Sequence, residues 1–198
     1  MSEIEAAAIG FRVKSGWATA VLLTAAGGDP RAVDRSVVEL SDAAFPESRQ
    51  PYHASTGKEE TDDARIQGRV KIVEQVARRS VAELVERYRK LAPRLGRAAL
   101  VVGSLTEPTK IANPHIRAHA YEGQLFRSVL DKSLRDCGFE CSAMLERDIY
   151  AQAVARLKRS EDDIKRVVDG MGASVGRPWT ANEKLAALAA WMSLAEPT

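Results

Sequence analysis

The stretch IGFRVKSGWATAV, at residues 9–21, decides how the chain begins to fold. Two apolar runs flank the turn sequence Lys-Ser-Gly, a pattern typical of two antiparallel strands joined by a tight turn. Gly, Asp and Pro then form a second turn, and the run at 32–42 predicts a third strand. The chain is therefore expected to open with three consecutive antiparallel strands.

The rest of the chain alternates between helical and strand patterns. Residues 46–63 are polar, contain two prolines and show no period, which predicts a single mobile loop. Apolar residues then recur in steps of three and four from Ile66 to Leu91, as in a long helix. The short apolar runs at 98–104 and 139–145 predict buried parallel strands, with a helix between them and three helices after the second.

Composition indicates an ordinary globular protein. The chain has 198 residues, 45% of them hydrophobic and 28% charged, and a net charge of +2, which favours one domain over residues 1–198. Cys137 and Cys141 lack the partners of a disulfide framework or zinc motif, so both are expected to be reduced. No apolar run approaches 18 residues and no basic leader opens the chain, so we expect a cytoplasmic protein without membrane association.

Positive charge is concentrated in one segment. Between Arg65 and Arg97 there are ten Lys and Arg residues against three acids. Such a segment either attracts phosphates or forms the solvated face of an amphipathic helix. We favour the second interpretation, because long surface helices are commonly rich in charge.

The order of elements is similar to the ribonuclease-H-like fold, and it resembles most closely the RuvC-type Holliday-junction resolvases. Four stretches carry the resemblance: IGFRVKSGWATAV at 9–21, ALVVGSLTEPTK at 99–110, GFECSAML at 138–145, and EDDIKRVVDGMGASVGRPWTANEKLAALAAWM at 161–192. The resemblance implies a five-stranded mixed sheet, three antiparallel strands followed by two parallel ones, with helices on both faces. It also implies a family activity in which clustered carboxylates hold two Mg²⁺ or Mn²⁺ ions for phosphodiester cleavage.

Most of those carboxylates are missing from this sequence. The aspartate of the family's first strand corresponds to Arg12, or to Phe11 in a register shifted by one. Neither side chain binds a divalent cation, and Lys14 on the same strand face adds to the repulsion. The resemblance therefore implies a relative without the nuclease chemistry, with Mg²⁺ or Mn²⁺ required only in the alternative that cleavage persists.

Two candidate catalytic carboxylates remain. Glu107 follows the fourth strand, and Glu183 matches one of the two acids of the family's last helix, where the other is replaced by Thr180. Both also fit purely structural roles. Thr180 and Glu183 have the spacing of a capping box, and Glu107 precedes a proline in a polar loop.

The sequence HIRAH, at residues 115–119, predicts an anion site. Its basic residues start a helix just beyond the fourth strand, and both helix starts and the carboxyl ends of parallel strands favour bound anions. The predicted anion-binding set comprises Arg12, Lys14, Lys110, His115, Arg117 and His119. His53, alone in the polar loop, is interpreted as incidental rather than catalytic. The sequence contains neither a metal-ligand set nor a cofactor motif.

Three functional hypotheses follow. The first is a non-catalytic ribonuclease-H-like domain that binds nucleic acid or another anionic partner. The second is a divergent metal-dependent nuclease using Glu107 and Glu183 with Asp162 or Asp163. The third is a homodimer or assembly subunit. The first hypothesis also predicts that Arg12 is buried and paired with Glu183, since an unpaired buried charge is costly.

Overall fold

The computed structural model describes residues 6–26, 29–54 and 57–195. At its centre is a five-stranded sheet with the order β3-β2-β1-β4-β5. The strands are β1 (Ala6–Lys14), β2 (Trp17–Ala25), β3 (Arg31–Glu39), β4 (Arg97–Val102) and β5 (Glu140–Leu145). β1, β2 and β3 pair antiparallel, while β4 runs parallel to β1 and β5 parallel to β4. The expected fold class is confirmed.

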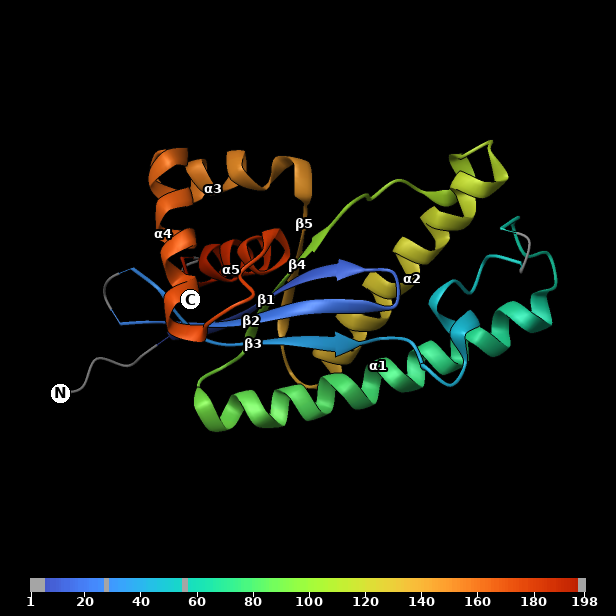
Figure 1. Cartoon of the computed structure of the whole chain (residues 1–198), viewed down its shortest axis with the longest axis horizontal. Helices are drawn as coiled ribbons and strands as arrows, with labels where there is room; N and C mark the ends of the chain where they lie inside the picture. Colours follow the sequence, from blue (N-terminus) through green and yellow to red (C-terminus); the bar gives the residue numbers. More distant parts are fainter. Residues whose placement is uncertain (1–5, 27–28, 55–56, 196–198) are drawn as a thin grey trace.

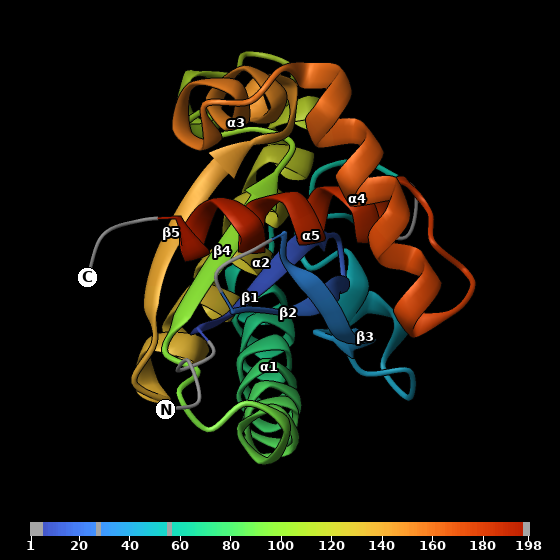
Figure 2. The ribbon, with the colours of Figure 1, turned by 90° about the vertical axis from the view of Figure 1, so that its left-hand side faces the viewer.

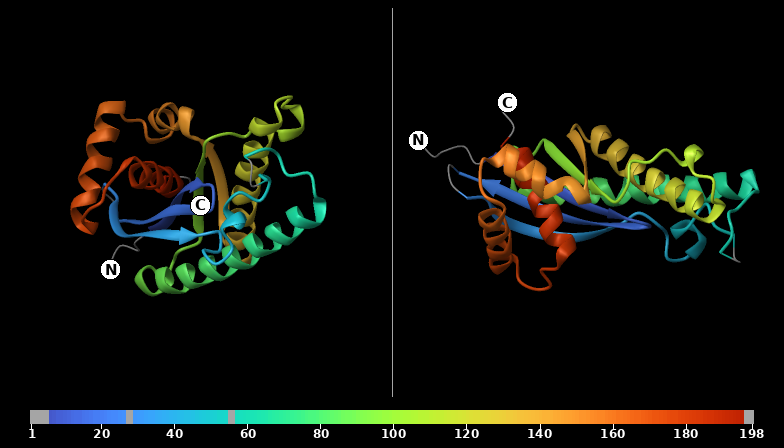
Figure 3. Two further views of the ribbon diagram at one scale, coloured as in Figure 1. Left: turned by 45° about the vertical axis from the view of Figure 1, so that its right-hand side comes forward. Right: turned by 90° about the horizontal axis from the view of Figure 1, so that it is seen from above.

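Helices cover both faces of the sheet (Figures 1 and 2). α1 (Asp63–Leu91) and α2 (Pro114–Asp136) pack on one face. α3 (Ile149–Leu157), α4 (Glu161–Val175) and α5 (Ala181–Leu194) pack on the other, as Figure 3 also shows. Three short 3-10 turns are η1 (Pro46–Arg49), η2 (Pro108–Lys110) and η3 (Glu146–Asp148). The molecule thus has two hydrophobic cores that share one sheet.

β1 lies in the middle of the sheet and contributes to both cores. Its alternate residues Ile9, Phe11 and Val13 belong to the α1–α2 core. Gly10 faces α5, and a Cβ built on it would lie 1.7 Å from the carbonyl oxygen of Ala186. The missing side chain therefore lets α5 lie directly against the central strand.

α1 carries the predicted concentration of positive charge. Its apolar stripe is buried, and its N-terminus is capped by Asp62, whose side chain accepts hydrogen bonds from the amides of Ala64 and Arg65. Along its solvated face, Arg87 lies 3.2 Å from Asp34. The helical interpretation of this segment is confirmed, and part of its charge is balanced within the chain.

The described residues of the predicted loop at 46–63 make several contacts with the rest of the molecule. The loop contains η1 and a β-bridge between His53 and Glu59. Arg69 of α1 donates hydrogen bonds to the carbonyls of Pro51 and His53, at 3.1 and 3.0 Å. Its mobility stays a prediction, but these contacts attach it to α1.

Both cysteines lie in the α1–α2 half of the molecule. Cys137 and Cys141 are free thiols, each half-buried beside the α1–α2 core. Among the described residues, no helix combines the length and the apolar character needed to span a bilayer.

Candidate anion-binding site

Arg12 is buried near the carboxyl end of β1. It is 4% exposed, and on the pleated strand it follows Gly10 on the face toward α5. Its guanidinium donates to the carbonyl oxygens of Val13 at 2.6 Å and Val101 at 3.4 Å, and it forms an ion pair with Glu146. Burial of a charged side chain at this position is confirmed.

The predicted partner of Arg12 was wrong. Glu183 completes a capping box: its carboxylate accepts hydrogen bonds from the Thr180 amide, at 2.8 Å, and from the Thr180 hydroxyl. The hydrogen-bonding capacity of this carboxylate is therefore used at the N-terminus of α5 itself. Glu146 instead follows β5 directly, at the same edge of the parallel strands as the end of β1. Its position directly after a parallel strand is a local sequence signal that makes it a candidate partner.

The other acids of the nuclease hypothesis have local partners or lie at the surface. Glu107 is exposed and lies 2.8 Å from Lys110, whose hydrogen bond, followed by that of Thr109, lowers the pKa of the Glu107 carboxyl. Asp163 pairs with Arg159 and Arg166. Asp162 is exposed in the first turn of α4. None of these acids belongs to the group of potential metal ligands found among the described residues.

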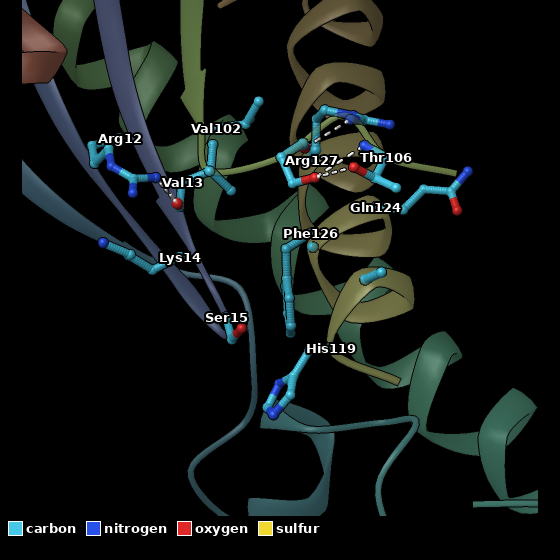
Figure 4. Close-up of a pocket in the computed structure, with 14 residues that line it drawn as sticks. Arg12, Val13, Lys14, Ser15, Val102, Thr106, His119, Gln124, Phe126 and Arg127 are labelled. Carbon is cyan, nitrogen blue, oxygen red and sulfur yellow. Dashed lines mark hydrogen bonds between the residues drawn. The ribbon is translucent and has the colours of Figure 1, made fainter. Parts of the chain in front are cut away.

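A pocket of about 260 Å³ lies at the carboxyl ends of β1 and β4, against α2. Figure 4 shows Arg12 and Lys14 on its β1 side, and Gln124 and Arg127 on its α2 side. Its polar lining residues are Arg12, Lys14, Ser15, Ser104, Thr106, His119, Gln124 and Arg127. Among the described residues that line it, none is acidic. This composition suits an anion.

The electrostatics of Lys14 agree with a positive pocket. Burial lowers the pKa of its ammonium group, and the nearby Arg12 lowers it further, while Glu146 acts in the opposite direction. An anion placed beside Lys14 would favour the charged ammonium form.

The predicted anion-binding set divides into two groups. Arg12, Lys14 and His119 line the pocket. The other three members are absent from the described lining, and each has a partner: Lys110 pairs with Glu107, Arg117 makes a two-pronged ion pair with Glu59, and His115 lies by the Gly57 carbonyl.

Arg127 and Gln124 are lining residues that sequence reasoning missed. Arg127 follows His119 by eight residues and Gly123 by four, so all three lie on one face of α2. Four-residue spacing downstream of HIRAH was the available signal. Only the packed structure shows that this face of α2 lies against the ends of β1 and β4.

Comparisons with known proteins agree with this architecture. No protein-family model matches the chain, and no curated protein matches it. Among solved structures, Thermus thermophilus RuvC is similar, with a TM-score of 0.56 and 12% sequence identity over 94% of this chain and 92% of that one. The same protein in complex with a Holliday-junction substrate gives a TM-score of 0.56 and 13% identity, covering 94% of this chain and 90% of that one. The chain therefore has the ribonuclease-H-like fold in the RuvC-like arrangement.

Proposed function

We propose that this protein is a non-catalytic relative of the nucleases with this fold, and that it binds nucleic acid through phosphates at the pocket between β1 and α2. The observation that supports this most strongly is the burial of Arg12 where the resemblance implies a metal-binding aspartate. Two unit charges 4 Å apart near a protein surface interact by about 4 kcal/mol, and a dication doubles this repulsion. A guanidinium at this position therefore opposes the two-metal arrangement.

The pocket lining matches the groups that contact phosphates in protein–nucleic acid complexes. Such contacts come mainly from Arg and Lys, with Ser, Thr and Gln as neutral donors. Lys14 and Arg127 provide the charges, and Ser104, Thr106 and Gln124 provide neutral donors. The lining set thus supports binding of a phosphodiester backbone.

Binding is tested by fluorescence anisotropy with a labelled duplex, a four-way DNA junction and single-stranded RNA. Affinity should fall steeply between about 50 and 200 mM salt, with a log–log slope of about −2 to −3 for two or three phosphate contacts. The double variant Lys14→Ala/Arg127→Ala should weaken binding at least tenfold and reduce the slope by about 2. Absence of binding at low salt would overturn the proposal.

A matched control removes two cations from the other end of the sheet. Lys90 and Arg94 are exposed, and they lie at the end of α1 and just before β4 begins. Lys90→Ala/Arg94→Ala changes the net charge by the same amount and should leave binding near that of the unaltered protein. Equal losses in both double variants would indicate a general charge effect and contradict a site at the pocket.

The nuclease hypothesis is tested in the same assay with Mn²⁺ added. The proposal expects an intact junction with the unaltered protein and with Arg12→Asp, because one restored carboxylate does not rebuild a two-ion site. Mn²⁺-dependent cleavage that is lost on Glu107→Gln or Glu183→Gln would overturn the non-catalytic assignment and establish the divergent nuclease.

A further inference from the structure

Three histidines meet beside the pocket, and they are all the histidines of the chain. His115 and His119 are four residues apart at the start of α2, so they lie on one helix face. His53 comes from the loop that precedes α1, and its ring centroid lies 5.2 Å from that of His115 and 4.4 Å from that of His119. One ring nitrogen from each residue lies within 4.8 Å of those of the other two.

In each of the three rings, Nδ1 faces an oxygen. His53 Nδ1 is 2.7 Å from Glu122 Oε1, and His115 Nδ1 is 3.0 Å from the Gly57 carbonyl oxygen. His119 Nδ1 lies 3.5 Å from the second carboxylate oxygen of Glu122. A neutral imidazole that donates from Nδ1 keeps its lone pair on Nε2. The hydrogen bonds at His53 and His115 therefore favour, in these two rings, the tautomer in which Nε2 is available to a metal ion.

The Nε2 atoms are the candidate ligand atoms. Nε2 of His115 and Nε2 of His119 form a hydrogen bond 3.3 Å long, which a shared metal ion would replace. Zinc–nitrogen bonds of about 2.0–2.1 Å in tetrahedral geometry place two ligand nitrogens about 3.4 Å apart. His53 Nε2 is buried and has no hydrogen-bond partner among the described residues. A buried polar atom of this kind requires a partner, and a shared cation supplies one for all three nitrogens.

Glu122 provides a carboxylate that can accept hydrogen bonds from the metal-binding histidines. It is fully buried, at 0% exposure, and its two oxygens face His53 and His119. Histidine ligands commonly donate their second ring nitrogen to a carboxylate, which fixes the ring orientation and increases the basicity of the ligand. A bound dication would also compensate the buried carboxylate.

We propose that His53, His115 and His119 bind a zinc-class transition-metal ion through Nε2, with Glu122 positioning two of the rings. Imidazole ligands suit Zn²⁺ and its neighbours, whereas Mg²⁺ and Mn²⁺ prefer oxygen. Three protein ligands leave a fourth position for water or an anion. The ion fastens the loop carrying His53 to the start of α2, and because His119 lines the pocket, it adds positive charge there.

The test uses full-length protein stripped with EDTA and titrated with ZnCl₂ or CoCl₂. We expect one Zn²⁺ per chain, a Co²⁺ visible spectrum typical of four-coordinate nitrogen sites, and a melting temperature raised by roughly 5–10 °C at a hundredfold excess over Kd. His115→Ala and His119→Ala alter exposed side chains, so both should fold and should bind Zn²⁺ at least a hundredfold more weakly.

Two further variants distinguish histidine ligation from ligation by the thiols and test the role of Glu122. Cys137→Ser/Cys141→Ser should bind Zn²⁺ unchanged, which excludes thiolate ligation. Glu122→Gln keeps the shape of the side chain and should weaken Zn²⁺ binding by about 10- to 100-fold. Three results would overturn the proposal. The histidine variants could bind Zn²⁺ as tightly as the unaltered protein, the cysteine variant could lose Zn²⁺ binding, or the unaltered protein could bind no Zn²⁺.

Discussion

At the scale of single residues, Arg12 shows how a charge is held inside this fold. Its guanidinium has two backbone carbonyls and one carboxylate as partners, and its Nε lacks a hydrogen bond among the described residues. Glu146 is 42% exposed on its side chain, so water screens the pair on one side. The arrangement is a partly buried ion pair at the end of the central strand.

Removing the carboxylate should destabilise the protein more than removing the guanidinium. Glu146→Ala leaves a buried cation without its counter-charge, and we expect a loss of roughly 1–3 kcal/mol, less than the 3–5 kcal/mol of fully buried pairs. Arg12→Met leaves Glu146 free to be hydrated and should cost less. Guanidinium unfolding of both variants measures the difference, and the reverse order would contradict the pairing.

Cys141 offers a prediction on pH. Burial, with a smaller contribution from Asp131, raises the pKa of its thiol to about 11, while Arg135 acts in the opposite direction. A raised thiol pKa disfavours the thiolate, so at pH 8 its alkylation should be roughly a hundredfold slower than that of an unperturbed cysteine with a pKa of about 8.5. Mass spectrometry after timed iodoacetamide treatment measures this rate. The same chain unfolded in guanidinium is the control, and equal rates in both states would contradict the prediction.

At the scale of elements, the contact between α5 and β1 depends on a missing side chain. Gly10→Ala would place a Cβ 1.7 Å from the Ala186 carbonyl oxygen and 2.8 Å from the Ala190 amide nitrogen. Both atoms belong to the helix backbone, so α5 itself must move. We expect a loss of at least about 3 kcal/mol, the upper end of overpacking costs, measured by guanidinium unfolding.

Gly170→Ala is the matched control for that substitution. Gly170 lies inside α4, and a Cβ there would meet nothing within 4 Å. Alanine favours the helical backbone, so this variant should be more stable by about 0.5–1 kcal/mol. Similar destabilisation by both alanines would show that close packing against α5 is not the cause.

α2 brings two sets of functional candidates to one place. His115, His119 and Glu122 are spaced by four and three residues, and His119, Gly123 and Arg127 are spaced by four. His119 belongs to both sets, which is why the proposed metal site and the pocket adjoin.

At the scale of the whole molecule, both hydrophobic cores are built on the same strands. β1, β2 and β4 contribute residues to each core, so the two cores share the strands on which they are built. We expect one cooperative transition, with far-UV circular dichroism and tryptophan fluorescence coinciding. Two of the three tryptophans, Trp179 and Trp191, report on the α3–α5 core, and the third, Trp17, begins β2. An earlier fluorescence transition would show that this face unfolds separately and would contradict the single domain over residues 1–198.

The assembly state stays a prediction at this scale. A homodimer or a role in a larger assembly was one of the three functional hypotheses. Light scattering over a range of protein concentrations measures it directly, and a monomer at every concentration would exclude the homodimer.

The sequence by itself determined the elements, their order and the sheet class. Strand alternation, helical periods and turn residues act over short distances, so each element could be recognised locally. The capping role of Glu183 was equally local, because Thr180 lies three residues away.

Only the tertiary structure decided which side chains meet. Arg12 pairs with Glu146, 134 residues away, rather than with Glu183. His53 joins His115 and His119 across more than sixty positions, a grouping that the sequence did not predict. Such contacts depend on the crossing of strands and helices after packing, and short-range periodicity in a single sequence carries no information about them.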